Sequence, residues 1–211
     1  MLGKPGVSRS TLKRLPLYLH LLERISAEGD EMVSCTRIAS EFDFDPTQVR
    51  KDLEATGASG TARIGFRVSP LIFRIREFLG WNNAHDAFLV GVGNMGKALL
   101  GYQDFEKYGL NIIAAFDKDP RKVGEKAFGK EVLPLKKLEG LVRRMHINIG
   151  IVTVPADQAQ EAVDLLVSAG VKAIWNFAPA PIRIPEGVIL ENARLTQSLA
   201  VLTNNLTSKL R

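Results

Sequence analysis

Apolar residues recur at helical spacing through the first 80 residues, whereas short apolar runs alternate with helical segments from residue 84 onward. In the first part we expect a basic arm over residues 1–13. A helix with Pro16 in its first turn should follow, because proline fits that turn, and should stop at Gly29. The residues on the apolar face of this helix are Leu15, Leu19, Leu22 and Ile25.

Two shorter helices are predicted to follow. Ser34 is suited to cap a helix over residues 35–42, and Asp45 to cap another over residues 47–55, with Pro46 in the first turn. A longer helix followed by two short helices that a turn connects is the helix-turn-helix arrangement.

The third helix has the side chains of a DNA-recognition helix. It buries Val49 and Leu53 and exposes residues that can pair with base edges and phosphates in a major groove. The exposed residues are Thr47, Gln48, Arg50 and Lys51. The alternative is a merely solvated face, on which the two cations pair with Asp52 and Glu54. The flanking helices favour the DNA-binding interpretation.

The glycine-rich segment over residues 58–68 alternates small and apolar residues, which predicts a β-hairpin wing. Arg63 lies at or near its tip, where an arginine can enter a minor groove. A fourth helix is expected from Ser69–Pro70 to about Leu79, and residues 80–83 form a linker. These elements together predict a winged helix.

The segment Gly91-Val92-Gly93-Asn94-Met95-Gly96 follows an apolar run and opens a helix, as dinucleotide-binding loops do. Gly91 permits a tight turn, Gly93 lets the backbone approach the phosphates, and Gly96 lets the helix pack on the strand. The N-terminus of the helix then offers N–H groups and the positive end of its dipole to the pyrophosphate.

A second strand, over residues 111–116, ends at Asp117. The distance from the glycine loop is about 20 residues, which is the spacing of the dinucleotide fingerprint. A carboxylate at this place accepts hydrogen bonds from both ribose hydroxyls and repels a 2′-phosphate. The sequence therefore predicts an NAD(H) site rather than an NADP(H) site.

The rest of the second part predicts further parallel strands with helices between them. The expected elements are helices over 135–145 and 156–169 and strands over 147–152, 171–175 and 188–190. Thr153, Val154 and Pro155 follow the first of these strands, at the edge where open α/β sheets bind ligands.

A final helix is expected over residues 195–210, and its leucines at helical spacing need a covering surface in this chain or in another. These leucines are Leu195, Leu199, Leu202, Leu206 and Leu210. Because winged helices usually read two half-sites, a homodimer is favoured.

Composition adds limits to this picture. The net charge of +5 and the isoelectric point near 9.4 suit a nucleic-acid partner without demanding one. The single cysteine, Cys35, excludes an internal disulfide and fits a reducing compartment. No apolar run approaches the length of about 18 residues that a membrane span needs. We expect a cytoplasmic protein with no membrane contact and no metal.

Several segments, taken in order, match one known family over almost the full chain. They are residues 14–19, residues 48–53, the glycine loop with Ala98 and Tyr102, residues 116–120, residues 154–156 with Gln160, and residues 176–179. In these segments the chain resembles the bacterial redox-sensing transcriptional repressor Rex family. The resemblance implies a homodimer that senses the NADH/NAD⁺ balance, leaves operator DNA when NADH binds, and exchanges its C-terminal helix between subunits. It also implies that Tyr102 and an apolar residue of that helix, such as Leu199, flank the nicotinamide.

Two positions depart from the family pattern. Ala62 stands where the family has its wing arginine, and Arg63 follows one place later. Arg194 stands where the family tends to carry an aspartate. The resemblance implies that this aspartate pairs with the arginine of the first helix, here Arg14. Two arginines cannot form that pair.

The predicted fold is α/β, with a winged helix-turn-helix over residues 1–80, a Rossmann-type parallel sheet over 84–192 and a C-terminal dimerisation helix over 193–211. The predicted NAD(H)-binding residues are Gly91, Val92, Gly93, Asn94, Met95, Gly96, Tyr102, Asp117, Lys118, Thr153, Val154, Pro155, Asn176 and Ala178. The predicted contacts to double-stranded operator DNA are Arg14, Ser34, Thr47, Gln48, Arg50, Lys51 and Arg63. No residue is predicted to be catalytic.

Two other functions stay open at this point. An NAD-dependent oxidoreductase usually needs an acid or base near the nicotinamide. His20, however, falls in the winged domain, and His85 and His146 each precede a strand, at the edge opposite the ligand crevice. A CoA-binding regulator would use a similar glycine loop, although Asp117 favours a ribose diol over the 3′-phosphate of CoA.

Overall fold

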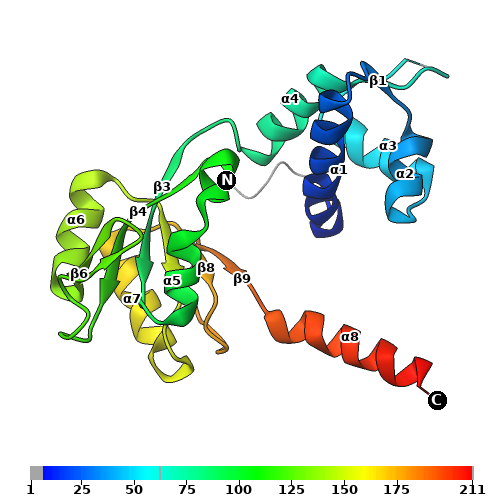
Figure 1. Ribbon diagram of the computed structural model, residues 1–211. Coiled ribbons are helices and arrows are strands. Elements are labelled where there is room, and N and C mark those ends of the chain that lie inside the picture. The colour runs from blue at the N-terminus through cyan, green and yellow to red at the C-terminus, as the bar shows by residue number, and fades with distance from the viewer. Residues whose placement is uncertain (1–6, 62, 211) are drawn as a thin grey trace. The chain divides into compact units, whose positions relative to one another are not determined.

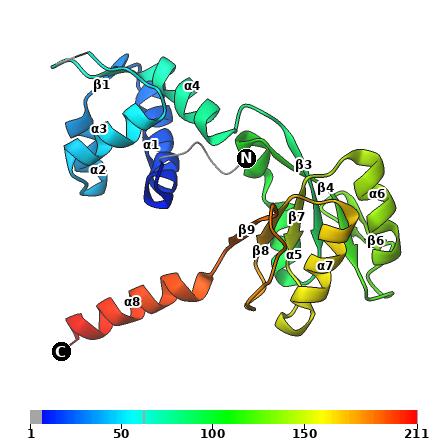
Figure 2. The same ribbon diagram turned by 180° about the vertical axis from the view of Figure 1, so that it is seen from behind.

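The computed structural model describes residues 7–61 and 63–210, and the chain divides after Asn83 into two compact units. Each unit is described by itself below (Figure 1, and from behind in Figure 2). Within the described residues, no helix combines the length and the apolar character that crossing a membrane requires.

The first unit contains four helices and a small two-stranded sheet within its described residues. Its elements are α1(Arg9–Ala27), β1(Met32–Val33), α2(Cys35–Phe42), α3(Pro46–Ala55), β2(Phe66–Arg67) and α4(Val68–Leu79). Ser34 Oγ accepts a hydrogen bond from the backbone N–H of Arg37 at 3.1 Å and so caps α2. The Asp45 carboxylate accepts from the backbone N–H of Thr47 at 2.7 Å and caps α3. Both short helices therefore begin within a residue of the predicted places.

Helix α1 is longer than predicted. It begins at Arg9, where Ser8 Oγ accepts a hydrogen bond from the Thr11 N–H at 3.0 Å, so Arg9 and Lys13 belong to the helix and not to a basic arm. Pro16 consequently lies in the helix interior, where it withholds one backbone donor at a cost of about 3 kcal/mol. The buried face of α1 offsets this cost. Its buried residues are Thr11, Leu15, Tyr18, Leu19, Leu21, Leu22 and Ile25.

The wing pairs differently from the predicted hairpin. β2 forms an antiparallel ladder with β1, in which Val33 lies opposite Phe66, and not with the segment just before it. Thr61 and Gly65 form an isolated bridge that closes the turn of the wing. A Cβ on Gly65 would lie 2.2 Å from the Val33 carbonyl oxygen. Glycine at this position therefore allows the wing to approach β1.

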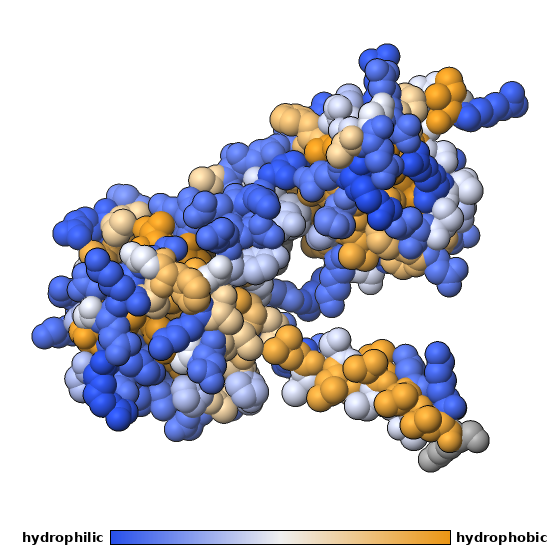
Figure 3. All heavy atoms as spheres, viewed as in Figure 1, coloured by the Kyte–Doolittle hydropathy of each residue, from blue (hydrophilic) through white to orange (hydrophobic). Residues whose placement is uncertain are grey.

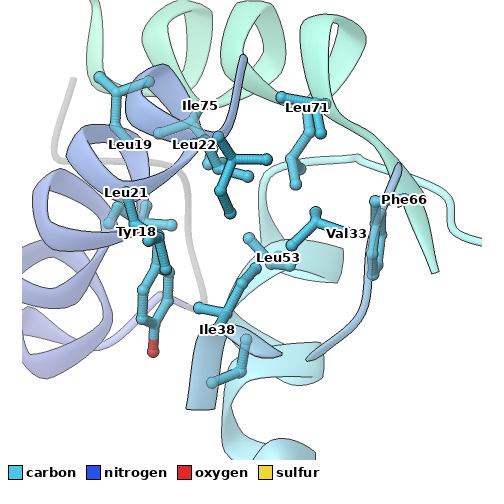
Figure 4. Packing of buried hydrophobic residues seen from close by; sticks show 14 of the residues in the cluster. Tyr18, Leu19, Leu21, Leu22, Val33, Ile38, Leu53, Phe66, Leu71 and Ile75 are labelled. Carbon is cyan, nitrogen blue, oxygen red and sulfur yellow. The ribbon is translucent and has the colours of Figure 1, made fainter. Parts of the chain in front are cut away.

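One apolar core holds the first unit together. Leu22 of α1, Leu53 of α3 and Ile75 of α4 are fully buried, and Figure 4 shows their side chains directed into the same interior. Phe66 of β2 closes one side of this core. The recognition helix α3 is therefore held by the same core that joins α1, α4 and the wing strand β2.

The second unit is a seven-stranded sheet with helices on both faces, counted over the described residues. Its strands are β3(His85–Val90), β4(Leu110–Asp117), β5(Lys126–Ala127), β6(Lys130–Pro134), β7(Ile149–Val152), β8(Ala173–Asn176) and β9(Ile189–Asn192). Their order is β5-β6-β4-β3-β7-β8-β9, and every pair is parallel except β5 with β6. Numbered along the chain, the six parallel strands have the order 3-2-1-4-5-6 of the Rossmann fold. The predicted fold class is confirmed, although β5 and β6 were not predicted.

Alternate residues of β3 point to the two faces of the sheet. Phe88 and Val90 pack in the cluster that α6 and α7 cover, whereas Ala87 and Leu89 pack in the cluster on the α5 side. The helices are α5(Asn94–Gly101), α6(Leu138–Met145) and α7(Ala159–Ala169), with 3-10 turns η1(Gln103–Tyr108), η2(Leu135–Lys137) and η3(Ala156–Gln158). The segment between β8 and β9 contains no described helix and packs in the cluster of α6 and α7 through Ile182 and Ile184, so it does not cover the α5 side of β8, where Trp175 stays half-buried.

The last helix, α8(Leu195–Lys209), buries none of its residues. Its leucines stay between 53% and 78% exposed when Leu210, just past the helix, is included. Figure 3 shows them as a nearly continuous apolar row along α8. The helix predicted from the leucine spacing is present, and its apolar face lacks a cover within the described chain.

Candidate functional site

The glycine loop forms a cradle that is open on one side. Gly91 has φ of +101°, and a Cβ there would lie 2.7 Å from a Val154 methyl carbon. A Cβ on Gly96 would lie 2.1 Å from the Gly91 carbonyl oxygen, so α5 packs on the loop as only glycine allows. A Cβ on Gly93, in contrast, would meet nothing within 4 Å. The space beside Gly93 is where a phosphate can approach the backbone.

Thr153 fastens this cradle to the neighbouring strand. Its hydroxyl donates to the Gly91 carbonyl oxygen at 2.6 Å and approaches that of Val90 at 3.2 Å. Helix α5 starts at Asn94 with no side chain capping it, so its first N–H groups face the cradle. The loop, the helix start and the end of β7 thus form one anion-binding surface.

A cavity of about 380 Å³ lies beside this surface, along the carboxyl ends of β3, β4 and β7. Its lining includes seven predicted residues: Gly91, Gly93, Asp117, Lys118, Thr153, Val154 and Pro155. Val92 lies next to this set and donates its backbone N–H to Asp117, whereas Asn94 and Met95 belong to the first turn of α5. The structure therefore brings most of the predicted cofactor residues to one edge of the sheet.

Asp117 is the anionic end of this cavity and is only 7% exposed. Its Oδ2 accepts hydrogen bonds from Val92 N–H at 2.8 Å and Lys122 Nζ at 2.9 Å, and its Oδ1 accepts from Asp119 N–H at 2.9 Å. Burial acts to raise the pKa of Asp117, but these hydrogen bonds and the Lys122 charge outweigh it and lower the pKa overall. Asp117 is therefore ionised and acts only as an acceptor.

Three predicted cofactor residues, Tyr102, Asn176 and Ala178, belong neither to the lining of this cavity nor to the glycine loop and the helix start that follows it. Tyr102 stands at the far end of α5, about 12 Å along the helix axis from the glycine loop, and is 49% exposed. Asn176 is 1% exposed, and its amide bonds to both backbone groups of Ala178 and to Asn192 Oδ1 at 2.8 Å. These bonds hold the turn after β8, which gives Asn176 a structural role in this chain.

A row of aromatic rings was not predicted. Tyr102 packs edge-on against Phe105 with centroids 4.7 Å apart, Phe105 against Trp175 at 5.5 Å, and Trp175 against Phe177 at 4.8 Å. The row runs from the end of α5 to the carboxyl end of β8, on the face where β8 lacks a helix. Spacing along the chain could not reveal it, because its members come from separate elements.

The first unit presents the predicted recognition helix to solvent. Thr47, Gln48, Arg50 and Lys51 are all exposed on α3. Arg50 and Glu54 approach only to 3.8 Å and both side chains are more than half exposed, so this pair constrains Arg50 little. Gln48 Nε2 donates to Asp52 at 3.0 Å, which fixes the direction of its amide.

Asp52 was considered only in the alternative that was not favoured, as a solvent-exposed partner of the cations of α3, whereas it is 1% exposed. It accepts hydrogen bonds from Arg14 Nε at 2.6 Å and Arg14 Nη2 at 2.8 Å, and one each at 2.9 Å from Thr11 and Tyr18. Burial acts to raise the pKa of Asp52, but these hydrogen bonds, that of Arg14 above all, lower it overall.

This network also changes the interpretation of Arg14. Its guanidinium, which was expected to contact DNA, forms a bidentate pair with Asp52, and the Arg14 side chain is 20% exposed. The pair joins α1 to α3 and so orients the recognition helix. Arg194 stands at the position where the family pattern implies an aspartate that pairs with Arg14, and it is exposed at the start of α8.

The other predicted DNA contacts lie at the rim of α2 and in the wing. Ser34 uses its hydroxyl to cap α2, and Arg63 is exposed in the wing with φ of +65°. The expectation for Ala62 lies outside the described residues. A cavity of about 320 Å³ under the wing is lined by Ser59, Arg67 and Arg74 among others, so further cations accompany Arg63.

Neither Cys35 nor any of the three histidines lines the cavity beside the glycine loop. His85 begins β3 and His146 precedes β7, both at the edge of the sheet opposite the cavity. No cluster of three or more metal-ligating side chains occurs in the described part of the chain. Cys35 is half-buried at the start of α2, and burial raises the pKa of its thiol, which disfavours the reactive thiolate.

Comparison with known proteins follows the same division of the chain. Residues 6–54 match a family described as putative DNA-binding protein N-terminus, and residues 82–180 match one described as CoA binding domain. A redox-sensing transcriptional repressor Rex of Treponema denticola is 43% identical over 94% of this chain and 95% of its own. The chain belongs to the Rex family. The Rex protein of Bacteroides fragilis is 40% identical over 95% of this chain and 91% of its own.

Solved structures of a Rex-family repressor called RSP are similar over the whole fold. RSP in complex with NAD⁺ and operator DNA has a TM-score of 0.91 at 35% identity, covering 98% of this chain and 95% of its own. RSP in complex with NADH has a TM-score of 0.86 at 34% identity, covering 99% of this chain and 100% of its own. These Rex relatives are named as transcriptional repressors and not as enzymes.

Proposed function

We propose that this Rex-family chain is a homodimeric repressor that binds double-stranded operator DNA through α3 and the wing and leaves it when NADH binds. The observation that carries the proposal is the pairing of Asp117 with the open cradle beside Gly93, at one edge of the sheet, in a chain whose recognition helix exposes Arg50 and Lys51. One chain thus contains both a site of dinucleotide chemistry and a site of DNA chemistry.

The residues around the glycine loop support NAD(H) as the ligand. Gly93 leaves room for the pyrophosphate beside the start of α5, where the helix dipole favours an anion. Asp117, kept ionised by its donors, can accept hydrogen bonds from the adenosine ribose hydroxyls and opposes a 2′-phosphate. Met95 and Asn94 would meet the phosphates through their backbone N–H groups.

Discrimination between the two redox forms requires an environment that treats their charges differently. The oxidised nicotinamide carries a positive charge that an apolar pocket desolvates, whereas the reduced ring is neutral. In this chain the aromatic row from Tyr102 to Phe177 supplies apolar surface near the end of β8. NADH can shift the balance between the DNA-binding and DNA-free conformations only by the difference between its affinities for the two.

Dimerisation supplies the surface that α8 lacks within its own chain. The helix exposes Leu195, Leu199, Leu202, Leu206 and Leu210. The α5 side of the sheet is open over β8, where Trp175 is half-buried. We infer that α8 of one subunit covers apolar surface of the other, in the exchanged arrangement that the family implies. Two winged helices then address two half-sites.

Operator binding requires access to the chromosome, so the cytoplasm is the compartment we propose. The decisive test is a fluorescence-anisotropy titration of a protein–operator complex, with the operator selected in vitro by the protein itself. NADH should release the DNA at lower concentration than NAD⁺, and NADPH and acetyl-CoA should release little. Release by acetyl-CoA alone would favour the CoA-binding alternative, and stable DNA binding that ignores all four ligands would reject the sensor.

A further inference from the structure

Three cations follow Asp117 within five residues, and they differ in what they contact. Arg121 is held by Asp119, whose carboxylate accepts Arg121 Nε at 3.0 Å and Nη2 at 2.8 Å. Lys118 is exposed and lines the nucleotide cavity. Lys122 lines the same cavity, is 33% exposed, and donates from Nζ to Asp117 Oδ2 at 2.9 Å.

The hydrogen bonds of Asp117 leave too few acceptor sites for a ribose diol. An ionised carboxylate offers about four lone-pair positions. Val92, Asp119 and Lys122 use three of them. A diol that donates two hydrogen bonds needs two positions, so one of the present donors must give way. The backbone donors of Val92 and Asp119 are fixed by the loop, whereas the lysine side chain can rotate.

The competition between Lys122 and a ribose hydroxyl for Asp117 indicates where Lys122 lies when the dinucleotide is bound. Its ammonium occupies a position on Asp117 Oδ2 that a ribose hydroxyl takes when the dinucleotide binds. When Lys122 is displaced, its flexible stem keeps the ammonium near that hydroxyl, because the residue lies on the loop that bounds the cavity. A 2′-phosphate, with about −1.5 to −2 charges at neutral pH, would therefore arrive beside a cation as well as beside a carboxylate.

We propose that Lys122 determines specificity at the adenosine-ribose site. The Lys122 side chain favours a 2′-phosphate, so that Asp117 alone excludes NADP(H). This inference rests on the proposed function, since it concerns the same site. It assigns opposite effects to two residues in contact. Asp117 favours the diol and repels the phosphate, whereas Lys122 competes with the diol and attracts the phosphate. Arg121 does not share this role, because Asp119 already neutralises it.

The test measures NADH and NADPH dissociation constants by nicotinamide fluorescence for the full-length protein and for Asp117→Asn, Lys122→Gln and the double variant. Asp117→Asn should bind NADPH at least tenfold more tightly than the unaltered protein does. The double variant should lose that gain by roughly tenfold, the scale of one charge-assisted hydrogen bond. Lys172→Gln is the matched control, because Lys172 is exposed just before β8, at the opposite edge of the sheet.

A single variant tests the same idea without disturbing Asp117. Lys122→Gln should bind NADH as tightly as the unaltered protein or more tightly, and should bind NADPH more weakly. Added salt should lower the NADPH affinity of Asp117→Asn more than that of the double variant, because the contact with Lys122 is between charges.

The outcomes separate the two proposals. If the unaltered protein prefers NADH but Lys122→Gln leaves the NADPH-to-NADH ratio unchanged, Lys122 does not reach the 2′ position and only this inference is rejected. The same holds if the double variant binds NADPH as tightly as Asp117→Asn. If the unaltered protein binds neither dinucleotide, both this inference and the proposed function are rejected.

Discussion

Replacing Asp52 by asparagine should destabilise the first unit by about 3 kcal/mol, although Asp52 is not a predicted contact with DNA. The change keeps the shape of the side chain but removes its charge and turns one acceptor atom into a donor. Asp52 accepts five hydrogen bonds from Thr11, Arg14, Tyr18 and Gln48, of which Oδ2 alone accepts two. At least two bonds are therefore lost, and Arg14 loses its counter-ion.

The magnitude follows from the burial of the pair. Removing one partner of a buried ion pair costs about 3–5 kcal/mol. Because Arg14 is 20% exposed, water relieves part of this penalty, which places the expected loss near the lower end, at about 3 kcal/mol. Glu54→Gln is the control, since its ion pair with Arg50 is long and exposed and should contribute less than about 0.5 kcal/mol.

Urea unfolding measures this loss in the full-length protein. Trp81 packs against the core of the first unit and Trp175 lies in the second, so Trp175→Phe leaves one tryptophan that reports on the first unit. Asp52→Asn and Glu54→Gln are then compared in that background, each with its own denaturant slope. A loss from Asp52→Asn that is no larger than the loss from Glu54→Gln would refute the argument.

The pH dependence provides a second check. The folded-state pKa of Asp52 is lowered relative to the unfolded value of about 3.9. A carboxylate of this kind contributes its full stability above the unfolded pKa and loses it as the pH falls through the folded pKa. The difference between the unaltered protein and Asp52→Asn should thus be constant from pH 7 to about 5 and shrink below about pH 4. A difference that persists undiminished at pH 3 would contradict the assignment.

Gly93→Ala should leave thermal stability unchanged and weaken NADH binding by roughly tenfold, because the added Cβ enters the open phosphate cradle. Gly140→Ala is the control, since Gly140 also faces open space but lies in α6, and it should leave NADH binding unchanged when the two variants are compared by calorimetric titration. Lys51→Ala should reduce the preference for operator over random DNA by about 1–3 kcal/mol in competition binding, and an equal loss for every sequence would identify Lys51 as a phosphate contact. Leu202→Asp should shift sedimentation toward the monomer, whereas Asn204→Asp should not; an unchanged dimer would remove α8 from the interface.

The nucleotide site was predictable because its signals are local. Gly91, Gly93 and Gly96 lie within six residues, and the strand before them and the helix after them are short periodic patterns. The spacing to Asp117 follows from one strand–helix–strand unit, which folds in only one hand. The same locality explains why the caps at Ser34 and Asp45 were predicted correctly.

The parts that could not be predicted depend on contacts between distant segments. β1 and β2 pair across more than thirty residues of sequence, so the wing looked like a simple hairpin. Helix α1 keeps Pro16 in its interior because tertiary packing outweighs its local cost. Asp52, however, could have been found. It shares one helical face with Val49, Leu53 and Thr56, and an acidic residue on an apolar face requires a buried cationic partner.

The Arg14–Asp52 network limits where the switch between DNA-bound and free states can act. A shift from 1:99 to 99:1 requires about 5.5 kcal/mol of differential binding, and breaking the Arg14–Asp52 ion pair would consume about 3 kcal/mol of it. We therefore expect the network to persist in both states, with α3 keeping its orientation on α1. We then expect the switch to move the first unit as a whole about the linker after Gly80. Because Arg14 is engaged within its own unit, Arg194→Asp should alter neither operator affinity nor the NADH concentration that releases DNA. A clear rise in both would show that Arg14 leaves Asp52 in the DNA-bound state.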